Sequence, residues 1–197
     1  MAARRAIARI TPENTALFVC DIQEKFSKSI QYFPEIVQTS RRLVDTAKIL
    51  KLPTLVTEQY PKGLGNTVPT LLEGLPENTP VYPKTKFSMC LPESASVLTN
   101  VQNVLIVGIE AHVCVLQTTY DLLEKGINVH VVVDAVSSRS LTDRKFAFKQ
   151  MENAGAVLTT SECAILGLVQ GSDHPSFKEV QKLILTSAPD VGLAHKL

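Results

Sequence analysis

One cysteine lies where an α/β protein commonly places a nucleophile. Cys114 belongs to the segment GIEAHVCV, residues 108–115, between an apolar strand pattern and a helical pattern. A thiol in the first turn of a helix lies near the positive end of the helix dipole, which favours the thiolate. Backbone N–H groups at the same turn can hold a developing oxyanion. The alternative is a small hydrophobic side chain that fills a gap, the usual role of a cysteine.

A carboxylate and two lysines offer matching acid–base chemistry. Asp21 follows the apolar run TALFVC, residues 15–20, where a buried strand meets a loop. A partly desolvated carboxylate there suits proton transfer, although a helix cap or a structural ion pair would explain it too. The segment PKTKFSM, residues 83–89, contains Lys84 and Lys86. A lysine near a thiol and a carboxylate holds both as anions, and spacing alone leaves the choice of lysine open.

The remaining histidine and cysteines near these segments have simpler interpretations. His112 precedes Cys114 by two residues, and we expect it to line the mouth of the site, because Asp21 is available as the base. Cys20 and Cys163 lie in apolar surroundings and are predicted to belong to the core. The sequence contains no phosphate-binding loop, dinucleotide fingerprint or serine elbow, so those classes lack their signatures.

Apolar strand patterns and helical patterns alternate along the chain. Strands are predicted at residues 15–20, 52–56, 81–83, 101–108, 128–133 and 156–159, and helices at 36–50, 113–125, 141–153, 161–168 and 175–185. The alternation predicts a three-layer α/β/α sandwich with a six-stranded parallel sheet. One domain is expected over 15–185, after an N-terminal tail at 1–14 and before a loose tail or interface arm at 186–197.

Ligands of open α/β sheets bind beyond the carboxyl ends of the strands. The rule selects these candidates: Asp21, Glu58 with its neighbours, Lys84, the turn at 108–114, and Asp134.

Composition excludes several classes of function. Lys+Arg total 20 against Asp+Glu 19, a net charge of +1, so nothing points to nucleic acid or an anionic membrane surface. The apolar runs are as long as strands and too short for membrane helices. Four scattered cysteines favour a reduced, cytoplasmic location, with the nucleus or mitochondrion as alternatives. Arg4, Arg5 and Arg9 form an exposed basic tail or, in the alternative, a mitochondrial targeting segment.

Three separated motifs together resemble the isochorismatase-like superfamily of cysteine hydrolases. They are FVCDIQEKF at 18–26, KTKFSM at 84–89 and GIEAHVCV at 108–115. The resemblance implies the Rossmann-like fold of that superfamily and a catalytic triad of Asp21, Lys84 and Cys114, and so selects Lys84 over Lys86. It also implies a non-proline cis peptide bond joining Glu110 to Ala111, which would aim the N–H groups of Ala111 and Cys114 at one oxyanion.

The resemblance implies a small-molecule hydrolase that forms a thioester and cleaves an amide-like C–N bond. The substrate pocket is expected to include Gln23, Phe26, Glu58, Gln59, Tyr60, Phe87 and His112. One alternative is a catalytically weak or vestigial protein that serves in binding or regulation. Another is thiol redox sensing through Cys114, although no resolving cysteine is near it in sequence.

No cofactor and no catalytic metal are expected. In nicotinamidases of the superfamily, an Asp-x-His pair and a second histidine after the second strand hold a metal. The matching residues, 57–83, contain no His, Cys or Asp, and this predicts a poor nicotinamidase. Glu58, Gln59 and Tyr60 are expected to bind a small polar substrate or, alternatively, to brace the loop at 63–65. A homo-oligomer is expected, because the helix at 113–125 is apolar on more than one face.

Overall fold

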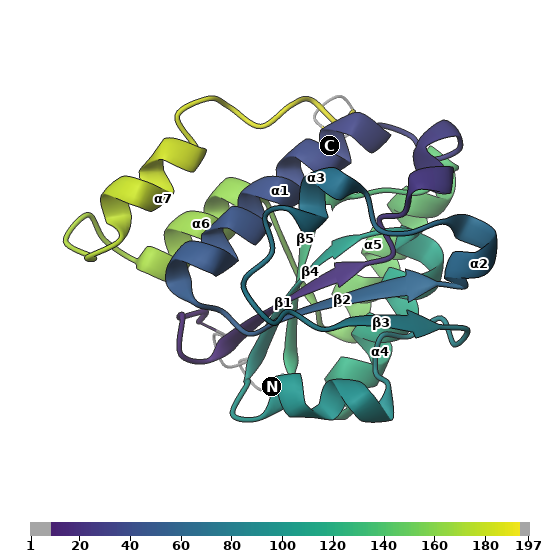
Figure 1. Cartoon of the computed structure of the whole chain (residues 1–197), viewed down its shortest axis with the longest axis horizontal. Coiled ribbons are helices and arrows are strands. Elements are labelled where there is room, and N and C mark those ends of the chain that lie inside the picture. The colour runs from purple at the N-terminus through teal and green to yellow at the C-terminus, as the bar shows by residue number, and fades with distance from the viewer. Residues whose placement is uncertain (1–8, 194–197) are drawn as a thin grey trace, which may run out of the picture.

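A six-stranded parallel sheet organises the protein, of which this computed structural model describes residues 9–193 (Figure 1). The strand order is β3-β2-β1-β4-β5-β6, and every neighbouring pair is parallel. The strands are β1 (Thr15–Cys20), β2 (Thr54–Gln59), β3 (Val81–Lys84), β4 (Asn103–Gly108), β5 (Asn128–Val136) and β6 (Val157–Thr159). The predicted sheet is therefore confirmed.

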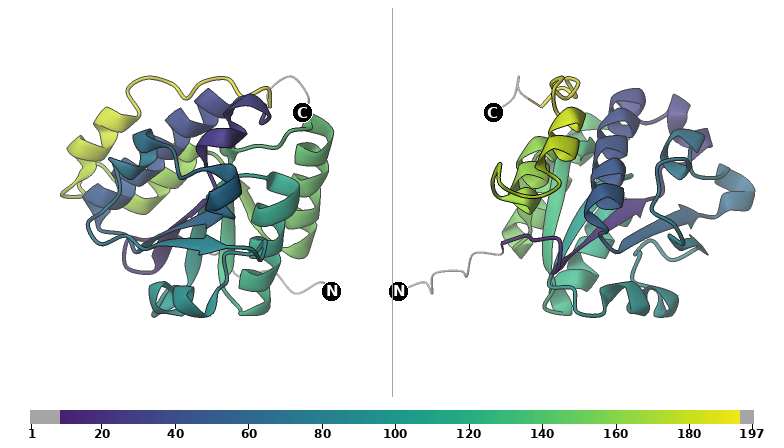
Figure 2. Two further views of the ribbon diagram at one scale, coloured as in Figure 1. Left: turned by 45° about the vertical axis from the view of Figure 1, so that its right-hand side comes forward. Right: turned by 60° about the vertical axis from the view of Figure 1, so that its left-hand side comes forward.

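Helices cover both faces of this sheet (Figure 2). One face packs against α1 (Phe33–Leu50), α6 (Ser161–Val169) and α7 (Phe177–Leu183). The other packs against α4 (Leu116–Glu124) and α5 (Leu141–Ala154). Shorter elements occupy the connections: the 3-10 helices η1 (Glu24–Lys28) and η2 (Pro92–Leu98), α2 (Pro61–Leu64), α3 (Pro69–Leu72) and the π-helical turn η3 (Ala111–Val115). The arrangement confirms the predicted three-layer sandwich.

Side chains of β1 alternate between the two helical layers. Leu17 and Val19 belong to the core beneath α1, whereas Phe18 and Cys20 belong to the core beneath α4 and α5. Successive strand residues point to opposite faces of a sheet, so the parity of the strand fixes this assignment. Cys20 therefore faces the layer that also contains Cys114.

The chain reverses its direction of winding between β1 and β4. From β1 it adds β2 and β3 on one side, and then returns to place β4, β5 and β6 on the other. A crevice forms at the carboxyl ends of the two strands at such a switch point. Asp21 follows β1 directly, and Cys114 lies shortly after the end of β4. The topology thus brings both residues to one edge of the sheet.

Two strands continue three residues beyond their predicted ends, and β3, β4 and β6 differ from their predicted bounds by one or two residues. β2 begins at Thr54, after Pro53, which has no N–H to donate, and continues to Gln59. β5 continues to Val136, so Asp134 does not end a strand. Its carboxylate instead accepts from the N–H and hydroxyl of Ser161, at 2.8 and 2.5 Å. Asp134 holds the start of α6, and its selection as a site candidate was wrong.

The contact between β1 and β4 requires a glycine. Gly108 has a φ of 123°, and a Cβ atom there would lie 2.0 Å from the carbonyl oxygen of Cys20. The next N–H, of Ile109, donates to that same oxygen at 2.9 Å. The turn that leads to Cys114 is therefore tied to the backbone of Cys20.

The segment after α7 packs against the body of the protein, whereas the sequence predicts a loose tail or an interface arm (Figure 1). Arg42 of α1 donates to the carbonyl of Ser187 at 3.0 Å, and Arg144 of α5 donates to that of Val191 at 2.7 Å. These donors come from opposite faces of the sheet, so the segment links the two helical layers.

Within residues 9–193, no helix combines the length and apolar character needed to span a bilayer. Arg4 and Arg5 lie outside the described residues, so the exposed basic tail and its targeting alternative stay predictions. Cytoplasmic location also stays a prediction.

Arg144 provides a test of this packing. Its side chain is 2% exposed, its two Nη atoms donate to Val191 and Val133 carbonyls, and its Nε has no partner among the described residues. Burial lowers the pKa of Arg144 to about 10. Arg144→Met leaves both carbonyls without this donor and should lower the free energy of unfolding by roughly 1–3 kcal/mol.

Urea denaturation measures this effect. Lys145→Met, an exposed neighbour on the same helix, is the matched control and should change stability by less than about 0.5 kcal/mol. Equal stability of Arg144→Met and the unaltered protein would contradict the assigned role.

Candidate active site

A lysine lies between the carboxylate and the thiol that the sequence singled out. Lys84 Nζ is 2.7 Å from Asp21 Oδ2 and 3.6 Å from Cys114 Sγ. The three residues come from the end of β3, the loop after β1 and the turn after β4. All three are buried, with Cys114 the most accessible at 6% exposed. The structure thus brings the predicted triad together.

Neighbouring acceptors fix the Lys84 ammonium in place. Nζ also donates to Gln59 Oε1 at 2.7 Å and to the Phe87 carbonyl at 2.8 Å. Burial lowers the pKa of Lys84, but the charges of Cys20, Asp21 and Cys114 outweigh burial, and the pKa lies above its ordinary value. The ammonium is therefore charged at neutral pH.

The other lysine of this segment faces away from the triad. The Lys86 side chain is 60% exposed and pairs with Asp121 on α4 at 3.0 Å. Spacing left the choice of lysine open, and the structure places Lys84 beside the carboxylate and the thiol.

The Asp21 carboxylate is held at both oxygens. Oδ2 accepts from Lys84, and Oδ1 accepts from the hydroxyl of Thr57 at 2.7 Å. The backbone of Asp21 is left-handed, with a φ of 51°, a conformation that non-glycine residues adopt rarely and often at functional sites. The sequence analysis missed Thr57 because the apolar run of β2 ends at Val56, although the strand continues.

A π-helical turn carries Cys114. The Val115 N–H donates to the carbonyl of Glu110, five residues earlier, at 3.2 Å. The α-helix proper begins only at Leu116, later than the predicted start at 113. π-Helical turns are rare and frequently occur at functional sites. Cys114 therefore lies just before α4 rather than inside it.

Two expectations about the oxyanion site need correction. The cis peptide bond joins Ile109 to Glu110, one residue earlier than predicted, because its place depends on where β4 ends and η3 begins. The Ala111 N–H donates to the Ser137 carbonyl at 2.9 Å, so it is not free for an oxyanion. Within the described part of the chain, the Glu110 N–H has no acceptor. The Glu110 carboxylate accepts from the N–H and Nε of Arg139, at 3.0 and 3.2 Å.

Two residues expected in the substrate pocket brace a loop. Gln23 is fully buried, donates to the carbonyls of Gln59 and Gly65, and accepts from the Gln59 N–H. Glu58 accepts from the Thr67 N–H at 2.6 Å. Their polar groups are used by backbone partners in the segment at 59–67. The bracing alternative stated for Glu58 therefore has structural support, and Gln23, expected only in the pocket, braces the same segment.

The other expected pocket residues lie nearer the surface. Tyr60 and Phe87 are exposed, at 55% and 54%, while Phe26 and His112 are half-buried. His112 Nδ1 pairs with the Ser138 hydroxyl at 3.0 Å. Tyr60 directly follows Gln59, and the Phe87 carbonyl accepts from Lys84, so the backbone at both positions lies close to the triad.

The sequence analysis missed a second thiol at the site. Cys20 Sγ, an Asp21 carboxylate oxygen and Cys114 Sγ all lie within 4.8 Å of one another. Burial, then a hydrogen bond with Cys114 and the negative charge of Asp21, raise the pKa of Cys20 well above its ordinary value. Period-two alternation along β1 could have assigned Cys20 to a face of the sheet but could not have shown which residues cover that face.

Cys163, also predicted in the core, is exposed on the first turn of α6.

The donor set does not fit a metal ion. Cys20, Asp21 and Cys114 could supply three ligand atoms, but the charged Lys84 ammonium contacts two of these residues and would repel a cation. The region at 57–83, where metal-dependent relatives were expected to differ, contains no His, Cys or Asp.

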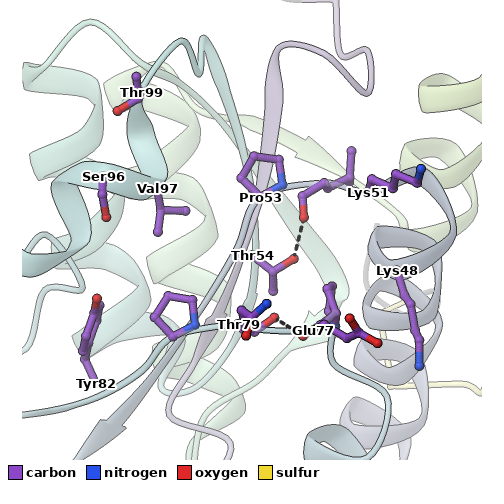
Figure 3. A pocket seen from close by; sticks show the side chains of 14 residues that line it. Lys48, Lys51, Pro53, Thr54, Glu77, Thr79, Tyr82, Ser96, Val97 and Thr99 are labelled. Carbon is purple, nitrogen blue, oxygen red and sulfur yellow. Dashed lines mark hydrogen bonds between the residues drawn. The ribbon is translucent and has the colours of Figure 1, made fainter.

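A cavity of about 780 Å³ lies near the amino ends of the strands (Figure 3). It opens beside the start of β2 and β3, whereas the triad lies beyond their carboxyl ends. The hydroxyls of Thr54 and Thr79 in its wall donate to the nearby carbonyls of Leu52 and Pro76. Because these hydroxyls already donate to backbone carbonyls, the volume of the cavity is no evidence that it binds a ligand.

Comparisons with known proteins agree on one family. The family model described as "Isochorismatase domain" matches residues 15–163. Human isochorismatase domain-containing protein 2 is 50% identical over 195 residues, which cover 98% of this chain and 93% of that protein. A solved structure described as MAR1 ribonuclease from Caenorhabditis elegans is 77% identical with a TM-score of 0.94, covering 94% of this chain and 97% of that one.

A more distant structure shares the fold. It is the YcaC gene product of Escherichia coli, described as an octameric hydrolase of unknown specificity. It is 22% identical with a TM-score of 0.79, and the match covers 91% of this chain and 97% of that one.

The two lysines of the β3 segment allow a matched test of the site. Cys114 should be the thiol that iodoacetamide alkylates fastest at neutral pH. Lys84→Met should slow this alkylation roughly tenfold or more, because it removes the cation that contacts the attacking sulfur at 3.6 Å. Lys86→Met removes the same charge from the exposed side and should leave the rate unchanged.

Mass spectrometry of the alkylated peptides gives the rate at each cysteine. The interpretation fails if Cys90 or Cys163 reacts before Cys114, or if the two lysine variants slow alkylation equally.

Proposed function

The chain belongs to the isochorismatase family, and on that premise we propose that it is a small-molecule hydrolase with Cys114 as nucleophile. Asp21 is the general base and acid, and Lys84 stabilises both anions. The substrate class is a small compound with an amide-like C–N bond. The observation that carries the proposal is the position of Lys84 Nζ, in contact with Asp21 and Cys114 at once.

The first half of the reaction forms a thioester. Asp21 takes the thiol proton of Cys114, whose Sγ lies within 4.8 Å of the carboxylate. The thiolate attacks the carbonyl carbon, and the oxyanion is held by the N–H groups of Glu110 and Cys114. As the C–N bond breaks, its electron pair stays on nitrogen, which takes the proton back from Asp21 and leaves as an amine.

The second half hydrolyses the thioester. Asp21 takes a proton from a water molecule, and the hydroxide attacks the thioester carbonyl. The C–S bond breaks, its electron pair returns to Cys114, and the carboxylic acid leaves. Cys114 regains the proton from Asp21, so the enzyme is unchanged and one water has cleaved one amide. Throughout, Lys84 stabilises whichever of the two groups carries the negative charge.

Hydrolysis of RNA is the second candidate, because the 77% identical structure is described as a ribonuclease. Two observations favour the small-molecule substrate. A net charge of +1 supplies no general attraction for a polyanion. Cys114 and its partners are nearly buried, which suits a small substrate better than a polynucleotide.

An activity screen with a matched pair of variants tests the proposal. Amides, hydroxamates, vinyl ethers and a short RNA should be incubated with the protein, Cys114→Ala and Cys163→Ser. We expect turnover of an amide-like compound that Cys114→Ala loses by a factor on the order of 10³ or more, because it lacks the nucleophile. Cys163→Ser, an exposed site on α6, should retain it.

The other outcomes separate the alternatives. A thioester mass on Cys114 in quenched reactions would support the covalent route. Turnover that survives in Cys114→Ala would contradict it, and cleavage of RNA alone would favour the second candidate. Binding without turnover across the panel would favour the binding or regulatory role.

We also propose a homo-oligomer. The helix-face argument from the sequence is weaker in the structure, because Leu116 and Leu122 of α4 are buried within the chain. Apolar side chains do remain exposed elsewhere, among them Phe146 on α5 and Leu185 after α7. Light scattering at micromolar concentration should give a multiple of the monomer mass, and a monomer mass would contradict the proposal.

A further inference from the structure

The proposed hydrolysis leaves one thiol of the site, that of Cys20, without a role. Cys20 Sγ lies in the same cluster as Cys114 Sγ, within 4.8 Å, and both cysteines are free. Their accessibility differs, since Cys20 is 0% exposed and Cys114 is 6% exposed. A small reagent therefore reaches Cys114 first.

We propose that Cys20 and Cys114 form a reversible redox pair, in which a hydroperoxide oxidises Cys114 and Cys20 then closes a disulfide with it. The inference requires a reactive Cys114, but it does not require turnover of any substrate. Absence of the proposed hydrolase activity would therefore not contradict the redox pair.

The fold holds the two cysteines together. Cys20 ends β1 with its side chain toward the α4 and α5 layer, where Cys114 also lies. The Ile109 N–H donates to the Cys20 carbonyl at 2.9 Å, which ties the turn before Cys114 to β1. Gly108 permits this close approach, because a Cβ atom there would meet the same carbonyl. The pairing therefore arises from the contact between β1 and β4, not from a surface encounter.

The first step oxidises Cys114. Its thiolate, stabilised by Lys84 at 3.6 Å, attacks the distal oxygen of a hydroperoxide. An S–O bond forms and the O–O bond breaks, so the thiolate is oxidised and the peroxide is reduced to an alcohol or water. The alkoxide or hydroxide that leaves takes a proton from solvent, and Cys114 becomes a sulfenic acid.

The second step uses Cys20. Cys20 Sγ is 3.7 Å from Asp21 Oδ2, which can accept its proton. The charge of a Cys114 thiolate is among the causes that raise the pKa of Cys20, and the neutral sulfenic acid removes that charge. The Cys20 thiolate attacks the Cys114 sulfur, the S–O bond breaks, and the hydroxide takes the proton from Asp21 and leaves as water.

The disulfide has two consequences for the site. Cys114 loses its nucleophilic thiolate, and a thiol reductant restores both cysteines. The disulfide also prevents further oxidation of Cys114 to the sulfinic acid, which thiols do not reverse.

Hydrogen peroxide applied to the full chain tests this pair. Peptide mapping should find a Cys20–Cys114 disulfide, with loss of two hydrogen atoms, and dithiothreitol should reverse it. In Cys20→Ala, peroxide should instead add two oxygen atoms to Cys114. At least roughly tenfold less Cys114 thiol should then return with dithiothreitol than in the unaltered protein. Cys163→Ser and Cys90→Ser are controls that retain both partners and should behave as the unaltered protein does.

Three results would overturn the pair. They are sulfinic acid on Cys114 beside a free Cys20 in the unaltered protein, a disulfide from Cys114 to another cysteine, and equal recovery of Cys114 in Cys20→Ala. If Cys20→Ala fails to fold, the peptide map of the unaltered protein decides alone. Absence of hydrolase activity does not bear on these readouts.

Discussion

A buried ion pair between Asp21 and Lys84 sets the main constraint on this structure. The two side chains are 1% and 0% exposed and lie 2.7 Å apart. Removing such charges from water costs several kcal/mol each, and their attraction offsets this only when hydrogen bonds complete the arrangement. Thr57 and Gln59, on one face of β2, supply those bonds. A pair of this kind adds little net stability, and here the Thr57 hydroxyl and the side-chain and backbone oxygens of Gln59 and Phe87 complete its hydrogen bonds. A buried, fully bonded charge pair of this kind beside a thiol is the physical basis of the proposed site.

The sheet topology explains why the thiol joins that pair. β1 and β4 are neighbours at the switch point, so the residues after each strand meet at one edge. The same contact brings Cys20 beside Cys114. In the two proposed reactions one cation serves both chemistries, since Lys84 contacts the sulfur that would attack carbonyl carbon and that peroxide would oxidise. Both proposals therefore rest on the same contact.

Residues near the triad have different structural roles. Gln23 and Glu58 hydrogen-bond to backbone groups of the segment at 59–67. The loop follows Gln59, the last residue of β2, which accepts a hydrogen bond from Lys84. Tyr60 and Phe87 are exposed. Polar residues close to the triad in sequence thus position the loop and one ammonium group, while the aromatic rings of Tyr60 and Phe87 are exposed.

The sequence by itself predicted the six strands and the five longer helices, and the resemblance of its motifs to a known family selected Asp21, Lys84 and Cys114. Apolar periodicity is a local property, and the motifs around Asp21, Lys84 and Cys114 carry their own order along the chain. Only the tertiary structure decided that Cys20 adjoins Cys114, that Asp134 holds α6, that the Ala111 N–H is already bonded, and which peptide bond is cis. Each of these features depends on which residues of different strands and helices are in contact. Strand pairing and the packing of helices on the sheet determine these contacts between residues far apart in sequence, and no local sequence pattern specifies them.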